Sequence, residues 1–394
     1  MRRVLPFLLF LFILAALLRV DFFFTTAYLF FAVYVLARLW TRRSLKQVRV
    51  QRQFTNRAFS GDEVTVRVLV RNTGRLPIPW LQAHESLPVD LATPPFHVEV
   101  FSLGPREQRH FSYALHCRKR GVYPVGPLRA QTGDLLGIEE PDSLEAAPDH
   151  LIVYPRILPL GKLDLPTRSP LVALHARAPL FEDPARVTGV RDYQRGDSPR
   201  RIHWTATASA GRLLVKQYQP AIARETLICL DLDVEGYDPR RRYDATELAI
   251  VIAASIANHI VVRERLPVGL MTEALDPLLN ERARLFLPPR PERAHLMSLL
   301  EALARVQVTR ATPVAEILSR QRPRLAWGVT LIVVTGRESE ALYDTLAHLQ
   351  QAGFAVALIL VQAARAPAET QARAAVLKIR VHRVWNERDL EQWR

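Results

Sequence analysis

The stretch TLICLDLDVEG, residues 226–236, decides how the largest part of this chain folds. Its first half, Thr226 to Asp231, is an apolar run with the length of a buried strand, and acidic residues follow at once. A helical period of 3.6 residues then extends from about Asp244 to Arg263, and a second strand is predicted at Pro267–Met271. Strand, helix and strand in this order are typical of a parallel sheet.

The same alternation continues toward the C-terminus. Further strands are predicted at Val329–Val334 and Ala355–Val361, and they interleave with helices near Glu292–Ala304, Pro313–Arg320 and Ser339–Ala352. This order predicts a doubly wound α/β domain over residues 221–394. Ligands of such sheets bind at the carboxyl ends of the strands, where Asp231 and Asp233 stand.

Residues 47–150 have a different pattern, with short runs that alternate between apolar and polar side chains. The clearest are EVTVRVLVR at 63–71, HVEVF at 97–101 and QRHFSYALHC at 108–117. Turn signals containing Gly61, Gly74, Gly104 and Gly126 separate them. We predict an antiparallel β-sandwich, immunoglobulin-like, in which single histidines have no catalytic or metal-binding spacing.

Residues 1–46 contain two apolar runs, Val4 to Leu18 and Phe22 to about Leu39, separated by the polar residues Arg19 and Asp21. Each run is close to the roughly 17–25 residues that cross a bilayer as a helix. We therefore predict a two-helix transmembrane hairpin. A cleaved signal peptide is the competing interpretation, but a second span follows at once and no Ala-x-Ala site separates the two runs.

Basic residues flank both runs on the same side of the predicted hairpin. Before the first run stand Arg2 and Arg3, and around the end of the second stand Arg38, Arg42, Arg43, Lys46 and Arg49. Because cytoplasmic flanks carry the excess of Lys and Arg, we expect a multi-pass protein of the cell membrane with both termini in the cytoplasm.

Composition excludes several classes of protein. The 394 residues include 2 cysteines, Cys117 and Cys229, too far apart for a CxxC pair, so neither a disulfide framework nor a cysteine zinc site is indicated. The net charge is +14, but the basic residues, nearly all arginine, are spread along the chain. We therefore regard nucleic-acid binding through the arginines as an alternative and not as the main expectation.

A connector, residues 151–220, contains a distinctive motif within TGVRDYQRGDSPRRIHWTATASAGRLLVKQY, residues 188–218. The Gly196-Asp197-Ser198-Pro199 turn can start a short helix, with Asp197 or Ser198 as its cap. Gly211 can end the helix before a strand. The candidate partner-binding or motif residues are Arg191, Tyr193, Gly196, Asp197, Ser198, Arg200, His203 and Trp204.

This motif resembles the signature of the family called domain of unknown function fifty-eight. The resemblance extends to the hairpin, to the sandwich segments Arg120-Gly121-x-Tyr123-x-x-Gly126-Pro127 and Asp134-Leu135-Leu136-Gly137, and to a C-terminal domain similar to von Willebrand factor A domains. Members of that family often accompany MoxR-type AAA+ ATPases. The resemblance therefore implies a protein partner and no established chemistry.

Two roles fit the motif residues Asp197, Arg200 and Trp204. In the first, a buried tryptophan and a buried arginine pair lock the segment against the C-terminal sheet. In the second, the same residues form a recognition surface. We favour the structural role because it explains the residue types without a ligand.

The resemblance to von Willebrand A domains also implies a site for Mg²⁺ or another divalent cation. Its ligands would be Asp231, Asp233 and, from a later loop, Thr312. Oxygen ligands of this kind suit hard cations. Neighbouring carboxylates without a cation are also common at strand ends, so the cation is an open expectation.

No phosphate-binding loop, dinucleotide fingerprint, HExxH or GxSxG occurs in the sequence. A hydrolase centred on Asp197, Ser198 and His203 is a further alternative, but no oxyanion motif accompanies these residues. We expect a membrane-anchored scaffold or adaptor that binds a protein partner, and not an enzyme.

Overall fold

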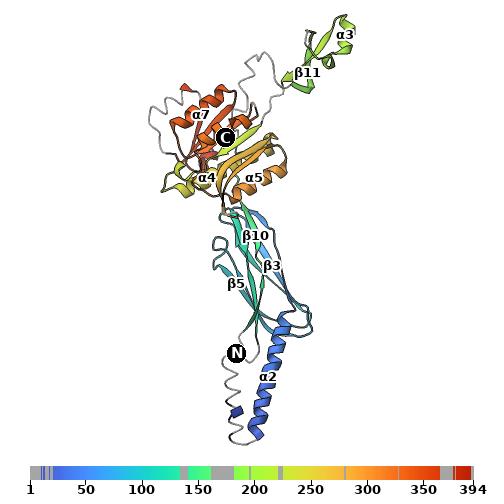
Figure 1. The fold of residues 1–394 in the computed structure, drawn as a ribbon, viewed down its shortest axis with the longest axis vertical. Coiled ribbons are helices and arrows are strands. Elements are labelled where there is room, and N and C mark those ends of the chain that lie inside the picture. Colours follow the sequence, from blue (N-terminus) through green and yellow to red (C-terminus); the bar gives the residue numbers. More distant parts are fainter. Residues whose placement is uncertain are drawn as a thin grey trace. The chain divides into compact units, whose positions relative to one another are not determined.

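The computed structural model describes residues 21–133, 141–160, 182–194, 197–220, 225–278, 281–326, 328–363, 376–377 and 379–391, and the isolated positions 10, 12, 13 and 17. The chain forms two compact units (Figure 1). The first comprises Met1–Arg156 with Leu303–Arg305, and the second Ile157–Ala302 with Val306–Arg394.

The first unit begins with helix α2, Asp21–Leu45, which contains the second predicted apolar run. Its stretch Phe22–Leu45 has the length and hydropathy of a membrane span, as does the buried helical stretch Arg242–Glu264 of the second unit. Large apolar side chains of α2 are exposed, among them Phe22, Tyr28 and Leu36. The first predicted run, Val4–Leu18, lies outside the described residues apart from isolated positions, so the hairpin remains a prediction.

Antiparallel strands follow α2 and pack around one hydrophobic core. The first sheet has the order β1-β3-β6, formed by Val48–Gln53, Glu63–Asn72 and Gln108–His116. The second has the order β5-β4-β8-β9, formed by Phe96–Leu103, Ile78–Ser86, Leu128–Thr132 and Asp142–Ala146. A third sheet has the order β2-β10-β7, formed by Arg57–Phe59, Asp149–Tyr154 and Gly121–Val125. The predicted antiparallel sandwich is confirmed except for one short pair, since β2 and β10 are parallel.

Alternation explains why these strands bury one face. In β3 the side chains of Val64, Val66, Val68 and Val70 are buried, and the residues between them are mostly exposed. They join one core with residues of the facing sheet, including Leu81. Strand β10 continues to Tyr154 and pairs with β7 and β2, so the sandwich extends past the boundary predicted at residue 150.

A two-stranded sheet carries the sequence motif. It consists of β11, Glu182–Asp192, antiparallel to β12, Leu214–Pro220, and between them lie the 3-10 turn η2, Pro199–Arg201, and helix α3, Trp204–Ala210. We call residues 189–216 of this arrangement the motif module. Gly196 and the side chain of Arg200 lie outside the described part of it.

The α/β domain has a six-stranded sheet in the order β15-β14-β13-β16-β17-β18. These strands are, in chain order, β13 (Thr226–Leu230), β14 (Val268–Asp276), β15 (Glu281–Arg290), β16 (Thr330–Thr335), β17 (Ala355–Val361) and β18 (Arg380–Val384). All neighbours are parallel except β14 and β15. The mainly parallel sheet is confirmed, whereas the antiparallel edge strand β15 was not predicted.

Helices lie along this sheet in the predicted order. They are α4 (Arg242–Asn258) with its π-helical continuation η4 (His259–Glu264), α5 (Arg293–Arg305), α6 (Val314–Gln321), α7 (Glu340–Gln351) and the short α9 (Glu387–Glu391). Every residue of β13 and β16 is buried, so both faces of the sheet centre are covered. The chain leaves β13 toward β14 on one side and later enters β16 on the other, which places a topological switch point between β13 and β16.

Candidate functional site

An ion pair organises the start of the motif module. The guanidinium of Arg191 donates from Nη1 and Nη2 to the two carboxylate oxygens of Asp197, each over 2.7 Å. The amide of Gln194 donates to the same carboxylate over 2.9 Å. These bonds hold the pKa of Asp197 at about 2. The side chains are 36% and 15% exposed, so this pair is partly solvated. The buried arginine pair was predicted with Arg200, whose side chain lies outside the described residues.

Helix capping in the module differs from the prediction. Proline 199 occupies the first turn of η2 as expected, but Ser198 stands before it without a side-chain capping bond. The next helix, α3, is capped instead by His203, whose Nδ1 accepts from the amide of Ala206 over 3.2 Å. Gly211, with φ 65°, ends α3 as predicted because a left-handed residue suits this position.

Trp204 is the largest departure from the expected role of the motif. Its side chain is 66% exposed, so the buried tryptophan predicted at this position is wrong. Val190 and Leu213 in the same module are 43% and 46% exposed. The backbone of Tyr193 is paired, its amide donating to the carbonyl of Leu213 over 2.9 Å. The polar motif residues thus build the module, and apolar side chains remain on its surface.

A second group of polar residues lies at the carboxyl ends of the central strands, at the switch point. Asp231 follows β13 directly and is buried. Its Oδ2 accepts from the hydroxyl of Thr335, at the end of β16, over 2.7 Å, and its Oδ1 accepts from the amide of Asp233 over 3.0 Å. Burial raises the pKa of Asp231 to about 6, against the opposing effect of these bonds.

Tyr237 packs next to Asp231, and Gly336 packs against the ring of Tyr237. The hydroxyl of Tyr237 donates to the main-chain carbonyl of Asp231 over 2.6 Å, and burial raises the pKa of this phenol well above its ordinary value. A Cβ at Gly336 would stand 2.3 Å from Cδ1 of Tyr237. Glycine is therefore required here for close packing against the tyrosine ring.

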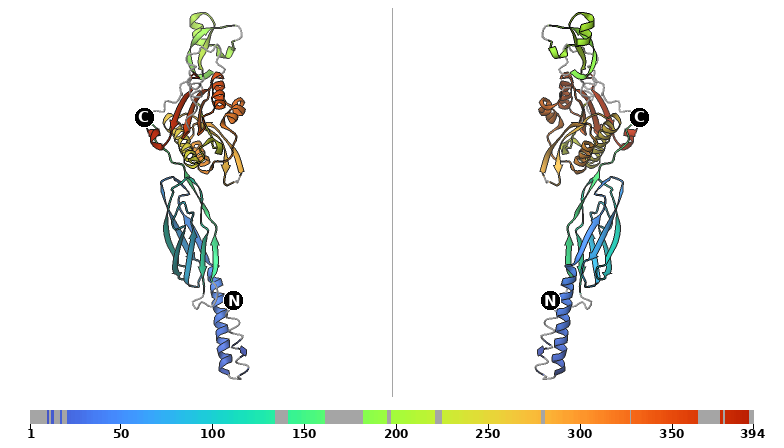
Figure 2. Two further views of the ribbon diagram at one scale, coloured as in Figure 1. Left: turned by 90° about the vertical axis from the view of Figure 1, so that its left-hand side faces the viewer. Right: turned by 90° about the vertical axis from the view of Figure 1, so that its right-hand side faces the viewer.

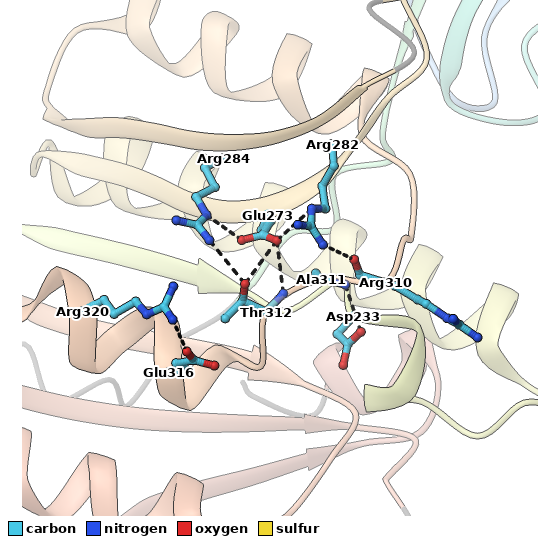
Figure 3. A network of polar contacts seen from close by, with 9 residues as sticks. All are labelled: Asp233, Glu273, Arg282, Arg284, Arg310, Ala311, Thr312, Glu316 and Arg320. Carbon is cyan, nitrogen blue, oxygen red and sulfur yellow. Dashed lines mark hydrogen bonds and ion pairs between the residues drawn. The ribbon is translucent and has the colours of Figure 1, made fainter.

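Asp233 and Thr312 belong to neighbouring but different hydrogen-bond groups. Oδ1 of Asp233 accepts from the amide of Ala311 over 3.1 Å. Thr312, the next residue, donates from its amide and its hydroxyl to Oε1 of Glu273, over 3.2 and 3.3 Å (Figure 3). The structure therefore brings Asp233 to Asp231, and it brings Thr312 to Glu273.

Glu273 lies in β14 and its side chain is 1% exposed. Arg284 donates from Nε to Oε2 over 2.8 Å, and Nε of Arg282 lies 3.3 Å from Oε1. Figure 3 shows both guanidinium groups reaching this carboxylate from β15. Burial alone raises the pKa of Glu273, but the bonds from Arg284 and Thr312 outweigh burial and hold it below the ordinary value.

These contacts limit what the strand-end group can do chemically. Both oxygens of Asp231 already accept hydrogen bonds, and Glu273 is neutralised by arginine. Within the described residues, no three His, Cys, Asp or Glu side chains are grouped so as to hold a metal ion. The hydrogen bonds of Asp231 join the loops at the ends of β13 and β16. Sequence reasoning missed Glu273, although a charged residue inside the apolar strand VGLMTEALD was a usable signal.

Comparisons with known proteins agree with the motif. The family described as "Protein of unknown function DUF58" matches residues 189–364. An uncharacterized protein of Bacillus subtilis, YeaD, is 25% identical over 345 residues, which cover 85% of this chain and 80% of that protein. Neither match brings an established activity.

Among solved structures, the CARDB domain of the PF1109 protein from Pyrococcus furiosus, in complex with di-metal ions, matches 27% of this chain and 91% of its own length, with 14% identity and a TM-score of 0.20. A β-glucosidase from Listeria innocua matches 28% of this chain and 16% of its own, with 12% identity and a TM-score of 0.18.

Proposed function

We propose that this chain is a membrane-anchored adaptor whose soluble domains face the cytoplasm and bind a protein partner through the motif module. The anchor would be α2 together with the first apolar run, as a two-helix hairpin. The basic residues on its flanks support the cytoplasmic orientation. The MoxR-type AAA+ ATPase implied by the family resemblance is the partner that we propose.

The exposure of Trp204 is the observation that carries this proposal. Trp204, Val190 and Leu213 are all exposed in this one module, so burying them against a partner is favourable. Tryptophan and arginine are also the residues most often found at the energetic centres of protein interfaces. The side chain of Arg212 in the module is 68% exposed and pairs with exposed Asp192 over 3.3 Å, so both charges are accessible to a partner.

The polar motif residues support the proposal in a second way. Asp197 is held by Arg191 and His203 caps α3, so these residues shape the loop that presents Trp204. A rigid presenting loop lowers the entropy lost on association. In this proposal the ion pair and the cap position Trp204, and Trp204 makes the contact with the partner.

Crosslinked co-purification of the tagged full-length protein from its own membranes tests the proposal. Trp204→Ala should lose the captured AAA+ ATPase, whereas Trp385→Ala, another exposed tryptophan that lies in the α/β domain, should retain it. Equal recovery with Trp204→Ala and wild type would refute the role of the module. External protease that cleaves after Arg43 in intact cells would refute the cytoplasmic orientation.

The finer fold assignments belong to this proposal. We propose that the sandwich is immunoglobulin-like and that the α/β domain is von Willebrand A-like. The antiparallel strands around one core support the first, and the doubly wound sheet with Asp231 at its switch point supports the second.

The divalent cation remains a separate proposal. Asp231 and Asp233 lie together, but Thr312 contacts Glu273 and the oxygens of Asp231 accept protein hydrogen bonds. A cation would have to displace Thr335 from Asp231. Addition of Mg²⁺ should raise the unfolding temperature of wild type and not of Asp231→Ala, Asp233→Ala if the site binds it, and an unchanged temperature would remove the cation from the proposal.

The two other functions receive less support. A hydrolase would need Ser198 near its base, but His203 contacts Ala206 and Asp197 contacts Arg191, and no bond joins Ser198 to His203 among the described residues. Loss of a measured hydrolytic activity in Ser198→Ala would restore that alternative. Nucleic-acid binding through the arginines would show affinity that falls steeply with salt.

A further inference from the structure

Helix α2 is joined to the sandwich without a linker. It ends at Leu45, and β1 begins at Val48. Both side chains are buried in the sandwich core, 6% and 0% exposed. Figure 2 shows α2 running into one end of the sandwich in both views. Because the end of the helix is part of the sandwich core, that end of the sandwich lies at a fixed position along the helix axis.

One loop of the sandwich is hydrogen-bonded to the end of α2, and a second loop is hydrogen-bonded to the first. We call residues 73–77 and 104–107 the basal loops. Nε1 of Trp40 donates to the carbonyl of Pro77 over 3.0 Å, and the hydroxyl of Thr73 donates to the carbonyl of Gln47 over 2.8 Å. The amide of Arg106 donates to the carbonyl of Gly74 over 3.0 Å, which joins the two loops. The basal loops therefore lie level with Trp40.

Trp40 indicates the depth in a membrane at which the basal loops would lie. Tryptophan is enriched at the boundary between hydrocarbon and headgroups, and Trp40 follows the apolar part of α2. The exposed residues Arg42 and Arg43 come next in the chain. If α2 spans the bilayer, the basal loops stand among the headgroups of the cytoplasmic leaflet.

The basal loops are basic on their exposed side. Arg75 and Arg106 are exposed, and no ion pair of either is found among the described residues. The acid of these loops, Glu107, is occupied: it accepts from the amide of Gly104 over 2.6 Å and pairs with Arg109 over 3.1 Å. Arg106 has φ 58°, a conformation that glycine or asparagine adopts with less strain. The turn geometry therefore does not account for arginine at this position.

We propose that the basal loops bind anionic phospholipid headgroups through Arg75 and Arg106, and that this contact orients the sandwich on the membrane surface. The inference rests on the membrane anchoring proposed above and adds a lipid-binding surface on the soluble domain. Anionic lipid is the occupant because the surface is cationic and the neighbouring helix is the proposed membrane span.

Lipid-selective quenching tests the proposal on the full-length protein in phosphatidylcholine vesicles that contain phosphatidylglycerol. A fluorophore is attached at Pro105→Cys, and both native cysteines are buried and so are protected from labelling. A nitroxide is carried at the same acyl carbon by either phosphatidylglycerol or phosphatidylcholine. We expect labelled phosphatidylglycerol to quench roughly fivefold more effectively at low salt. Arg75→Glu with Arg106→Glu should abolish this preference.

The matched control reverses two exposed arginines elsewhere on the sandwich, Arg67→Glu with Arg118→Glu, and should retain the preference. Equal quenching by the two lipids in wild type, or a preference that survives Arg75→Glu with Arg106→Glu, would overturn the inference. Retention of the protein in alkaline-washed membranes reports the anchor separately. A protein that is retained but shows no lipid preference refutes only the headgroup contact, and a protein that is released refutes the anchor on which it rests.

Discussion

The hydroxyl of Thr335 donates a 2.7 Å hydrogen bond to the buried carboxylate of Asp231, and this bond joins the ends of β16 and β13. Thr335→Val keeps the shape of the side chain and removes the donor. The free energy of unfolding should fall by about 1–3 kcal/mol, because the carboxylate loses a partner that water cannot replace. Pulse proteolysis in urea of the full-length protein in detergent measures the change.

Thr330→Val is the control for this substitution, since Thr330 is a buried residue of the same strand and its hydroxyl makes no side-chain hydrogen bond among the described residues. It should change stability less than Thr335→Val. Equal effects of the two substitutions would show that the bond to Asp231 contributes nothing specific.

Asp231 should make stability depend on pH between about 4 and 6. Its pKa is about 6 in the folded protein and 3.8 ordinarily, so in this interval the folded state binds more protons than the unfolded state. The stabilisation is complete below the lower value and is lost as pH rises to the higher one, by about 3 kcal/mol. Unfolding of wild type compared with Asp231→Asn across this range should show the difference, and parallel pH curves would contradict it.

Glu85 and Arg52 form a buried pair in the sandwich, with side chains 0% and 3% exposed and 2.8 Å between Oε1 and Nη2. Glu85→Gln should destabilise the sandwich by about 1–3 kcal/mol, because the guanidinium loses a charged acceptor but keeps Asp149, 3.0 Å from its Nη1. Glu145→Gln breaks the exposed pair with Arg129 and should cost less than about 1 kcal/mol. Similar losses in the two variants would contradict the importance of burial.

Gly336→Ala should destabilise the α/β domain by about 1–3 kcal/mol, since the new methyl group would overlap the ring of Tyr237. The double variant with Tyr237→Ala should lose less than the sum of the two single variants, because the overlap with the ring is gone and only the one with the carbonyl oxygen of Gly236, at 2.7 Å, remains. Thermal unfolding of the four proteins gives the coupling. If the losses in the two single variants simply add in the double variant, the destabilisation by Gly336→Ala does not come from overlap with the ring of Tyr237.

Much of the fold follows from the sequence pattern. Alternation in EVTVRVLVR predicted β3, which buries one face. The continuous apolar run TLICL predicted β13, which is buried on both faces. The edge strand β15 was missed because ERARLFLPPR carries charges and ends in two prolines, a composition that resembles a loop.

The candidate site was less predictable. The motif around Trp204 was recognisable from residue types and spacing, but its burial was predicted wrongly because a tryptophan is usually covered. His203 was a candidate motif residue and, in the hydrolase alternative, a member of the catalytic group, and the structure assigns it to the cap of α3.

By itself, the sequence determined the apolar N-terminal runs, the alternating strands and the acidic residues at the end of β13, because these depend on local periodicity and composition. Only the tertiary structure decided that Asp231 meets Thr335 and that Glu273 meets Arg284 and Thr312. It also decided that one loop at the sandwich base bonds to Trp40 and Gln47. Such contacts join residues far apart in the chain, and their partners follow from strand order and register, which no local pattern encodes.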